Sequence, residues 1–231
     1  NHLLSQTKIN EEQRNYLDGM KQSGKSLVQH VEDLLDYSTM EAGRFKLNPR
    51  AENLRRLIES IVEMLAHRAH EKGIEITSFV SPDVPDYLDF DPARLRQVLF
   101  NLLGNAVKFT REGGVVIRAR MLEGELQMTV EDTGPGMSER EQARIFGEFE
   151  QAGPMSQRSA GTGLGLAISA RIVREFGGSL TVSSHRGRGS IFTLSFRPGG
   201  APAAMPDPDR RHCLQHTNVL LIAPKGVAAA V

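Results

Sequence analysis

The sequence has little cysteine and no long apolar run. Cys213 is the only cysteine among 231 residues, which excludes an internal disulfide and a metal site built from several cysteines. No stretch of about 18 apolar residues is present, so no membrane-spanning segment is expected. No signal peptide is recognisable either. We therefore expect a cytoplasmic chain. It begins at Asn1 without a methionine, which we interpret as a fragment of a longer protein that can itself be membrane-anchored.

An excess of charge of either sign is also absent. Lys plus Arg and Asp plus Glu each number 28, so nothing favours nucleic acid or a charged membrane surface as a partner. The shares of hydrophobic residues, 39%, and of charged residues, 24%, are ordinary for a globular protein. The length suits one large domain or two small ones.

Residues 10–44 are predicted to form one long helix. Asn10 and Gln13 have the spacing of a capping box, with Asn in place of Ser or Thr. Apolar and small residues then recur as in a heptad seam: Leu17, Met20, Gly24, Leu27, Val31, Leu34 and Ser38, with Val28 and Leu35 beside them. One helix cannot bury such a stripe alone. We expect partner helices from a second copy of the chain, from upstream sequence or from both; packing on its own domain is the alternative.

The middle of the chain alternates between helix and strand signals. Helices are predicted at 53–72, from Asp91-Pro92 onward, and at 163–177. Strands are predicted at 74–80, 113–122, 125–132, 179–184 and 190–196, and residues 81–92 are expected to be a turn-rich connector. These elements favour the α+β class, with a mixed, largely antiparallel sheet covered by helices on one face in a two-layer α/β sandwich.

Four regions are therefore expected along the chain. Residues 1–48 form the helical region and 49–198 the sandwich. Residues 199–217 are rich in Pro, Gly, Ala and charge, which predicts a linker. Residues 218–231 open with the apolar run NVLLIA and are interpreted as the start of another domain.

The helix after Pro92 contains the stretch NLLGNAVKFT, residues 101–110. Asn101 and Asn105 lie four residues apart within an apolar run, with Lys108 one turn further on, so all three share a helical face. An amide oxygen such as that of Asn105 suits Mg²⁺, and a lysine offers a point charge to phosphate. The pattern indicates a site for a phosphate and its metal; a polar edge on a core helix is the simpler alternative.

Glycine is concentrated in one quarter of the chain, where 11 of the 22 glycines lie between Gly134 and Gly189. Glycine lets a backbone approach a ligand closely. The segment GTGLGLA places Gly161, Gly163 and Gly165 directly before a predicted helix, where backbone N–H groups can bind an anion such as a triphosphate. An ordinary turn is the alternative. The spacing matches neither a dinucleotide-binding fingerprint nor a Walker loop.

Asp132 ends an apolar predicted strand and precedes Gly134 and Gly136 in the segment EDTGPGM. A carboxylate there can accept a hydrogen bond from an exocyclic amine such as that of adenine, and a buried carboxylate needs such a partner. The alternative is an aspartate that organises its own turn.

Five segments together resemble the motifs of the ATP-binding domain of sensor histidine kinases, in the ATPase superfamily that includes gyrase and Hsp90. In chain order they are NLLGNAVKFT (N box), DTGPGM (first glycine box), IFGEFEQ (F box), GTGLGLA (second glycine box) and GRGSIFTLSF (closing strand). The end of the first helix, LLDYSTMEAGRFKL, resembles the second helix of the family's dimerisation and phosphotransfer domain. The resemblance implies the family's sandwich fold, preceded by a helix of a dimeric bundle.

The resemblance also implies roles at the base end of an ATP site. Asp132 would hold the adenine amine and Phe109 would line the base pocket. Gly134 and Gly136 would open a lid, which the aromatic residues of the F box would hold by packing: Phe146 and Phe149.

At the phosphate end, the resemblance implies that Asn105 binds Mg²⁺, Lys108 touches phosphate, and Asn101 supports this network. The residues implied to close over the phosphates come from the second glycine box: Gly161, Thr162, Gly163, Leu164 and Gly165. ATP and Mg²⁺ are the cofactors expected.

Asn101 separates two branches of the superfamily. The ATP hydrolases carry E-x-x-x-N, in which Glu activates water, whereas this chain has Asn101 in the first position. An amide cannot accept a proton at neutral pH, so hydrolysis loses its base. Transfer of the γ-phosphate to a side chain, which needs mainly positioning and charge stabilisation, is favoured instead.

The phosphoacceptor motif H-E-x-R-x-P of the family is absent, and neither His2 nor His30 fits it. We therefore expect a protein-histidine kinase core with no catalytic histidine of its own, acting with a response regulator or phosphotransfer protein in a two-component system. The run NVLLIAPKG resembles the first strand of a receiver domain but lacks the acidic pair that follows it. A nucleotide-binding scaffold without catalysis is the alternative function.

Overall fold

The computed structural model describes residues 10–148, 150 and 163–199. Its helices are α1 (Glu11–Glu41), α2 (Leu54–Glu71), α3 (Pro92–Phe109), α4 (Glu139–Gln142) and α5 (Gly165–Glu175). Its strands are β1 (Arg50–Glu52), β2 (Glu75–Val80), β3 (Leu88–Phe90), β4 (Gly114–Leu122), β5 (Glu125–Asp132), β6 (Ser179–His185) and β7 (Gly189–Phe196). None of the helices in these ranges is long and apolar enough to cross a bilayer.

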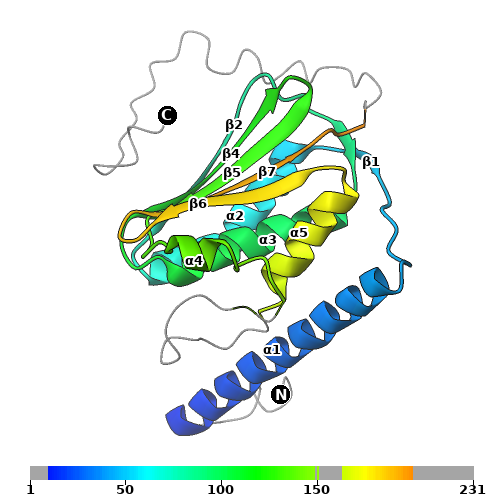
Figure 1. Cartoon of the computed structure of the whole chain (residues 1–231). Coiled ribbons are helices and arrows are strands. Elements are labelled where there is room, and N and C mark those ends of the chain that lie inside the picture. The colour runs from blue at the N-terminus through cyan, green and yellow to red at the C-terminus, as the bar shows by residue number, and fades with distance from the viewer. Residues whose placement is uncertain (1–9, 149, 151–162, 200–231) are drawn as a thin grey trace.

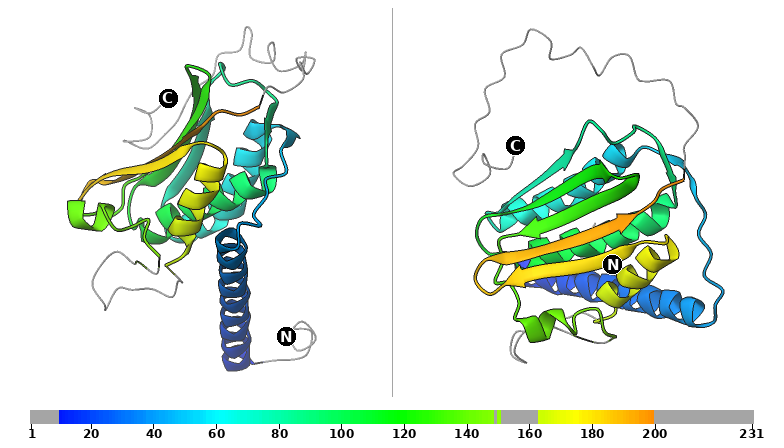
Figure 2. Two further views of the ribbon diagram at one scale, coloured as in Figure 1. Left: turned by 45° about the vertical axis from the view of Figure 1, so that its right-hand side comes forward. Right: turned by 45° about the horizontal axis from the view of Figure 1, so that its top comes forward.

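A five-stranded sheet forms one layer of the fold, with the strand order β2-β4-β5-β7-β6. β2 and β4 are parallel because α3 crosses over between them, and the other neighbouring strands are antiparallel. Figures 1 and 2 show α2, α3 and α5 on one face of this sheet. The predicted α+β sandwich with a mixed, largely antiparallel sheet is confirmed.

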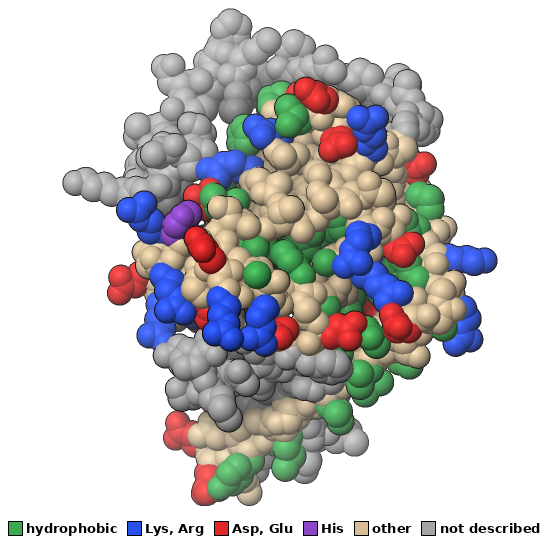
Figure 3. All heavy atoms as spheres, in the orientation of Figure 1, with side chains coloured by type: hydrophobic (Ala, Val, Ile, Leu, Met, Phe, Trp, Pro, Cys, Tyr) green, Lys and Arg blue, Asp and Glu red, His purple; other side chains and the backbone are tan. Residues whose placement is uncertain are grey.

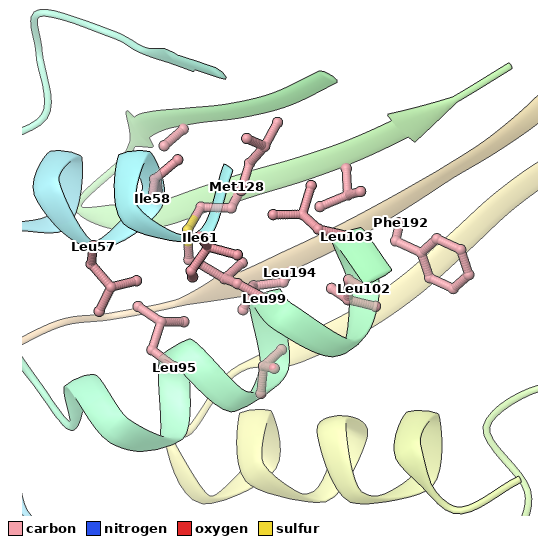
Figure 4. Close-up of a cluster of buried hydrophobic side chains, with 14 of the residues drawn as sticks. Leu57, Ile58, Ile61, Leu95, Leu99, Leu102, Leu103, Met128, Phe192 and Leu194 are labelled. Atoms are coloured by element: carbon pink, nitrogen blue, oxygen red, sulfur yellow. The ribbon is translucent and has the colours of Figure 1, made fainter. Parts of the chain in front are cut away.

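The hydrophobic core lies between the sheet and the helices. Alternate residues of β4 and β5 point inward and are almost fully buried, including Val115, Ile117, Leu126 and Met128. They meet one apolar face each of α2 and α3, formed by Leu57, Ile58 and Ile61 on the first helix and by Leu95, Leu99, Leu102 and Leu103 on the second (Figure 4). This packing fixes α3, so the polar side chains on the other side of α3 have defined positions.

Three short elements differ from the sequence-based expectation. β1 and β3 form a separate antiparallel pair, with Arg50 opposite Phe90 and Glu52 opposite Leu88. The expectation that residues 81–92 form only a connector is therefore wrong at 88–90. α4 begins after Ser138, which forms a capping box with Glu141. Elements of three or four residues are too short to produce a recognisable hydrophobic period.

α1 has the capping box expected at its start. The Gln13 N–H donates to Asn10 Oδ1 at 2.8 Å and the Asn10 N–H donates to Gln13 Oε1 at 3.0 Å. The helix ends at Glu41, followed by Gly43 at a φ of 64°. Of the predicted seam, Leu17 is buried, whereas four large members are 48–64% exposed: Met20, Leu27, Val31 and Leu34. Figure 3 shows hydrophobic side chains on the surface in the lower part of the molecule, where Figure 1 places α1.

The C-terminal part of α1 is tied to the sandwich by hydrogen bonds and an ion pair. Asp36 accepts from Arg94 Nη1 at 2.8 Å and from Gln97 Nε2 at 2.7 Å, both on α3. Arg171 of α5 donates from Nη2 to the Met40 carbonyl at 2.7 Å and also pairs with the Glu41 carboxylate. α1 therefore lies beyond the helical layer and is joined to it near residues 36–41 (Figure 1).

Candidate functional site

The two amides of the N box form a relay that ends on α5. Nδ2 of Asn105 donates to Oδ1 of Asn101 at 3.3 Å, and Nδ2 of Asn101 donates to Oγ of Ser169 at 3.0 Å. These bonds fix which way both amides point. Among the residues that the structure describes, none donates to Oδ1 of Asn105, so this oxygen can accept a ligand or bind a cation.

The second glycine box meets the N box at the start of α5. A β-carbon added at Gly165 would lie 2.5 Å from Oδ1 of Asn101, so only glycine allows this close approach. The N-cap position is held by Leu164, which is buried and cannot cap the first turn with its side chain. Backbone N–H groups in the first turn of a helix can bind an anion, and in α5 this turn begins at Gly165, beside the N-box amide of Asn101.

The last turn of α3 carries the other two N-box residues. Nζ of Lys108 lies 5.3 Å from the centre of the Phe109 ring, in a cation–π contact. Burial lowers the pKa of Lys108 from its ordinary value. Phe109 is 45% exposed, so part of its ring is available to a ligand.

Asp132 lies at the end of β5, next to Ser190 of β7, and is buried. Its Oδ1 accepts the Gly134 N–H at 2.8 Å. Burial is the largest influence on its carboxyl group and raises its pKa, while hydrogen bonds from Gly134 and Ser190 act in the opposite direction. The carboxylate therefore has protein partners for part of its hydrogen-bonding capacity and can accept another donor.

The first glycine box packs tightly against both neighbours. A β-carbon at Gly136, which has a φ of 64°, would lie 1.9 Å from the His185 carbonyl oxygen at the turn between β6 and β7. A β-carbon at Gly134 would lie 2.8 Å from Oδ1 of Asp132 and at an ordinary contact distance of 3.5 Å from the Phe109 carbonyl and Thr110 Oγ1. Gly134, two residues after Asp132, thus lies beside the end of α3, so the N box and both glycine boxes meet at that helix.

Phe146 of the F box contacts the sandwich through its ring. Its ring centre is 6.4 Å from that of Phe192 on β7, with the ring planes at 88°. In the second glycine box, Gly163 has a φ of 70°, a backbone conformation that favours glycine. Three residues predicted to contribute to the lid and the phosphate loop lie outside the described residues: Phe149, Gly161 and Thr162.

A cavity of about 1180 Å³ opens between α1, α2, α3 and α5. It is lined at one end by the phosphate-side residues, namely Asn101, Asn105, Lys108, Gly165 and Ser169. Asp132 and the first glycine box do not line it. The cavity therefore includes only the phosphate side of the candidate site.

Sequence reasoning missed two hydroxyl groups of this site. Ser169 orients Asn101, and Ser190 hydrogen-bonds with Asp132. Both serines are buried, within the otherwise apolar runs of α5 and β7. A buried polar residue in an apolar run is the signal that could have indicated them, because such a group needs a partner.

The comparison with known proteins identifies the family. Residues 90–199 match the family described as histidine kinase-, DNA gyrase B- and HSP90-like ATPase. Over 98% of its length, the chain is 35% identical to the signal transduction histidine-protein kinase BarA of Escherichia coli strain K12. The chain belongs to the sensor histidine kinase family. It carries the ATP-binding catalytic domain of these kinases, and its named relatives do not favour the alternative of a non-catalytic scaffold.

Other relatives agree with this assignment. Sensor protein GacS of Pseudomonas syringae pv. syringae is 41% identical over 85% of this chain, and RpfC of Xanthomonas campestris pv. campestris is 37% identical over 96%. The chain spans 25% of BarA, 22% of GacS and 31% of RpfC, so it corresponds to a part of these longer kinases.

Solved structures show the same fold. Full-length ShkA, determined in complex with AMPPNP, is 38% identical to this chain, with a TM-score of 0.75 over 87% of this chain and 42% of ShkA. The histidine kinase AdeS of Acinetobacter baumannii has a TM-score of 0.68 at 22% identity, over 84% of this chain and 88% of that one, and supports the fold alone.

Proposed function

We propose that this histidine kinase domain binds Mg²⁺-ATP through the N box, Asp132 and the two glycine boxes, and transfers the γ-phosphate to a histidine outside this chain. The observation that carries the proposal is the directed amide relay from Asn105 through Asn101 to Ser169 beside Gly165. The relay leaves Oδ1 of Asn105 able to accept a ligand, and the start of α5 at Gly165 lies beside Asn101. The AMPPNP bound by ShkA supports an ATP-like ligand.

The adenine base would be recognised at Asp132. Its buried carboxylate has an acceptor position beyond the Gly134 N–H, and the exocyclic amine of adenine is a donor of the right kind. The exposed ring of Phe109 would stack on or line the base. Gly134 and Gly136 allow the backbone to pass close to the base without side chains.

A magnesium ion fits the phosphate end of the site. Mg²⁺ takes oxygen ligands and keeps several waters, so one protein oxygen together with phosphate oxygens is a suitable donor set. Asn105 Oδ1 would supply that protein oxygen. No group of three or more His, Cys, Asp or Glu side chains able to hold a metal occurs in the described part of the chain, which agrees with an ion held mainly by the nucleotide. Such an ion would neutralise phosphate charge.

Asn101 favours phosphoryl transfer over hydrolysis. Its amide donates to Ser169 and accepts from Asn105, and an amide lacks the basicity to deprotonate water. Lys108 and the first-turn N–H groups of α5 would stabilise negative charge on the phosphates, with Gly161, Thr162, Gly163 and Leu164 completing the loop above them.

The phosphoacceptor histidine would come from a helix packed on α1. Exposed apolar side chains on α1, including Leu27, Val31 and Leu34, need a partner surface in water. We propose a two-fold homodimer in which α1 and the upstream helix form a bundle. Since ATP is a cytoplasmic nucleotide, this part of the protein would lie in the cytoplasm.

A response regulator or phosphotransfer protein would receive the phosphoryl group from that histidine. The named sensor kinases among the relatives support such a signalling role. The domain boundaries at 48, 198 and 217, and the receiver-like start at 218–231, remain part of this proposal and lie partly outside the described residues.

Isothermal titration calorimetry with Mg²⁺-AMPPNP tests nucleotide binding. The 231-residue chain should bind Mg²⁺-AMPPNP. Asp132→Ala should bind it at least about tenfold more weakly, because one charge-assisted hydrogen bond is lost. Asp86→Ala, at an exposed position, is the control and should bind with the affinity of the wild type. Equal affinity of Asp132→Ala and wild type would rule out the adenine role.

Phosphoryl transfer is tested with γ-labelled ATP. The chain alone should acquire no acid-labile label, and adding a kinase segment that carries an H-E-x-R-x-P histidine upstream of α1 should produce it. Nucleotide binding without any transfer to that histidine would favour the scaffold function instead.

A further inference from the structure

The C-terminal end of α3 is capped by a lysine from another helix. Nζ of Lys72 donates to the carbonyl oxygens of Val107 at 2.6 Å, Lys108 at 2.8 Å and Thr110 at 2.7 Å. An ammonium group has three N–H donors, so all of them are used. Three of the carbonyls that α3 leaves without an intrahelical partner are thereby satisfied by one side chain.

α3 needs this help because its own sequence does not cap it. The helices α1, α2 and α5 are each followed by a glycine at positive φ, namely Gly43, Gly73 and Gly177. α3 instead passes through Thr110, whose φ of −73° and ψ of 134° are extended. The chain therefore leaves α3 without the turn that usually satisfies the last carbonyls. A cation at this end also interacts favourably with the helix dipole.

Lys72 is itself held in place by the end of α2. The Gly73 N–H donates to the His70 carbonyl at 2.9 Å and the Ile74 N–H donates to the Ala69 carbonyl at 3.0 Å, which is a Schellman motif. Ile74 is buried in the core. The lysine stem thus starts from a fixed backbone, and the ammonium group has a defined position relative to α3.

The capped turn is the one that carries the nucleotide-contacting residues of the proposed site. Lys108 gives its carbonyl to Lys72 and its side chain to the candidate phosphate end, and Phe109 follows it. Lys72 also lines the cavity shared with Asn105 and Lys108, but its three donors are occupied by carbonyls. Lys72 can therefore influence nucleotide binding indirectly, by fixing the position of the last turn of α3.

We propose that Lys72 is a positioning residue of the ATP site, which holds the last turn of α3 so that Lys108 and Phe109 meet the nucleotide. This inference rests on the proposed function of the site. Without the ammonium group, these three carbonyls lose their protein donor and are left to hydrogen-bond with water. The last turn of α3 then frays, and the side chains of Lys108 and Phe109 lose their fixed direction.

The first test compares the affinity of the full chain for Mg²⁺-AMPPNP by calorimetry. Lys72→Met keeps the stem and removes the donors, and should bind about tenfold more weakly. Lys72→Arg keeps a cationic donor group and should restore much of the loss. Lys46→Met, at an exposed position, is the matched control and should bind like the wild type. Wild-type affinity of Lys72→Met overturns the proposal.

Double-variant cycles separate positioning from a general loss of stability. Lys72→Met is combined with Lys108→Ala and, separately, with Phe109→Ala, and affinities are measured well below each variant's melting temperature. The loss from Lys72→Met should fall to less than about threefold in at least one background, because the positioned group is already gone. Full additivity in both backgrounds overturns the proposal. If wild type and Lys46→Met fail to bind AMPPNP, the proposed function itself fails.

Discussion

Asn101 on α3 and Ser169 on α5 are joined by a hydrogen bond of 3.0 Å, although 68 residues separate them in the chain. Ser169 is almost completely buried, so this bond has little competition from water. It holds α5, and with it Gly165, against the amide side of α3. The geometry of the proposed phosphate end therefore depends on contact between two helices.

Gly165→Ala should disturb this contact directly. The added β-carbon would lie 2.5 Å from Asn101 Oδ1, and the Asn101 amide cannot swing away without losing its bonds to Ser169 and Asn105. We expect a loss of about 1–3 kcal/mol in the free energy of unfolding, as for overpacking, and weaker AMPPNP binding. Urea unfolding and calorimetry measure the two effects.

Gly104→Ala is the matched control for stability, because a β-carbon there meets nothing within 4 Å. It lies inside α3, where alanine is favoured over glycine by roughly 1 kcal/mol. The variant should therefore be as stable as the wild type or more so. A Gly165→Ala protein as stable as Gly104→Ala would contradict the packing described here.

Asp132 should make stability depend on pH in a defined direction. Burial raises its pKa above the ordinary 3.8, so the folded state binds this proton more tightly than the unfolded state. Its contribution to the free energy of unfolding is therefore greatest below the ordinary pKa and decreases as pH rises through the raised pKa. Asp132→Asn has no carboxyl group to titrate at this position. Its stability relative to wild type should therefore increase as pH rises from the ordinary pKa through the raised pKa of Asp132.

Urea unfolding of both proteins at a series of pH values checks this result. Asp86→Asn, at an exposed position, serves as the control for removal of a carboxylate. A difference between Asp132→Asn and wild type that stays constant with pH would show that Asp132 is not the group responsible. We also expect Asp132→Asn to bind AMPPNP more weakly, because the carboxylate acceptor is lost.

Removal of Mg²⁺ should act through Asn105. Chelation with EDTA is expected to weaken binding of AMPPNP to the wild type by about tenfold or more, as phosphate charge is no longer neutralised. Asn105→Ala should bind weakly with Mg²⁺ and show little further loss with EDTA. Ser183→Ala, exposed on β6, should retain the full magnesium effect. An unchanged magnesium dependence in Asn105→Ala would exclude Asn105 as the ligand.

The link between α1 and the sandwich should be measurable through Asp36 and Arg94. Their ion pair has a distance of 2.8 Å and side chains that are only 19% and 28% exposed. A double-mutant cycle with Asp36→Ala and Arg94→Ala should give a coupling free energy of about 1 kcal/mol in urea unfolding.

The pair formed by Arg50 and Glu52 provides the comparison. It is longer, at 3.4 Å, and its arginine side chain is 65% exposed. Its coupling should be close to zero because water screens exposed pairs. Equal coupling for the two pairs would mean that the Asp36 contact does not hold α1 in solution.

Much of the fold could be predicted from local patterns. The start of α1 follows from the Asn10 and Gln13 box, and the start of α3 from Asp91-Pro92, whose Asp91 side chain accepts from the N–H groups of Ala93 and Arg94. Alternating apolar residues in β4 and β5 indicated strands with one buried face. These signals act between residues a few positions apart, which is why one sequence is sufficient to find them.

The candidate site was predicted in its composition and only partly in its arrangement. Asn101 and Asn105 could be placed on one face of a helix because a helix has a fixed period. That Asn101 would point to Ser169 and that Lys72 would cap α3 had no local signal, since each involves segments more than 30 residues apart.

The sequence by itself therefore determined the longer elements, the N-caps of α1 and α3 and the residue types that an ATP site requires, because propensity and periodicity are local properties of the chain. The tertiary structure alone decided which distant groups meet: β1 with β3, Gly165 with Asn101, and Lys72 with the last carbonyls of α3. The physical reason is that burial of the common core brings these segments together. Polar groups that this burial removes from water must each find a partner, as the buried Ser169 does in Asn101.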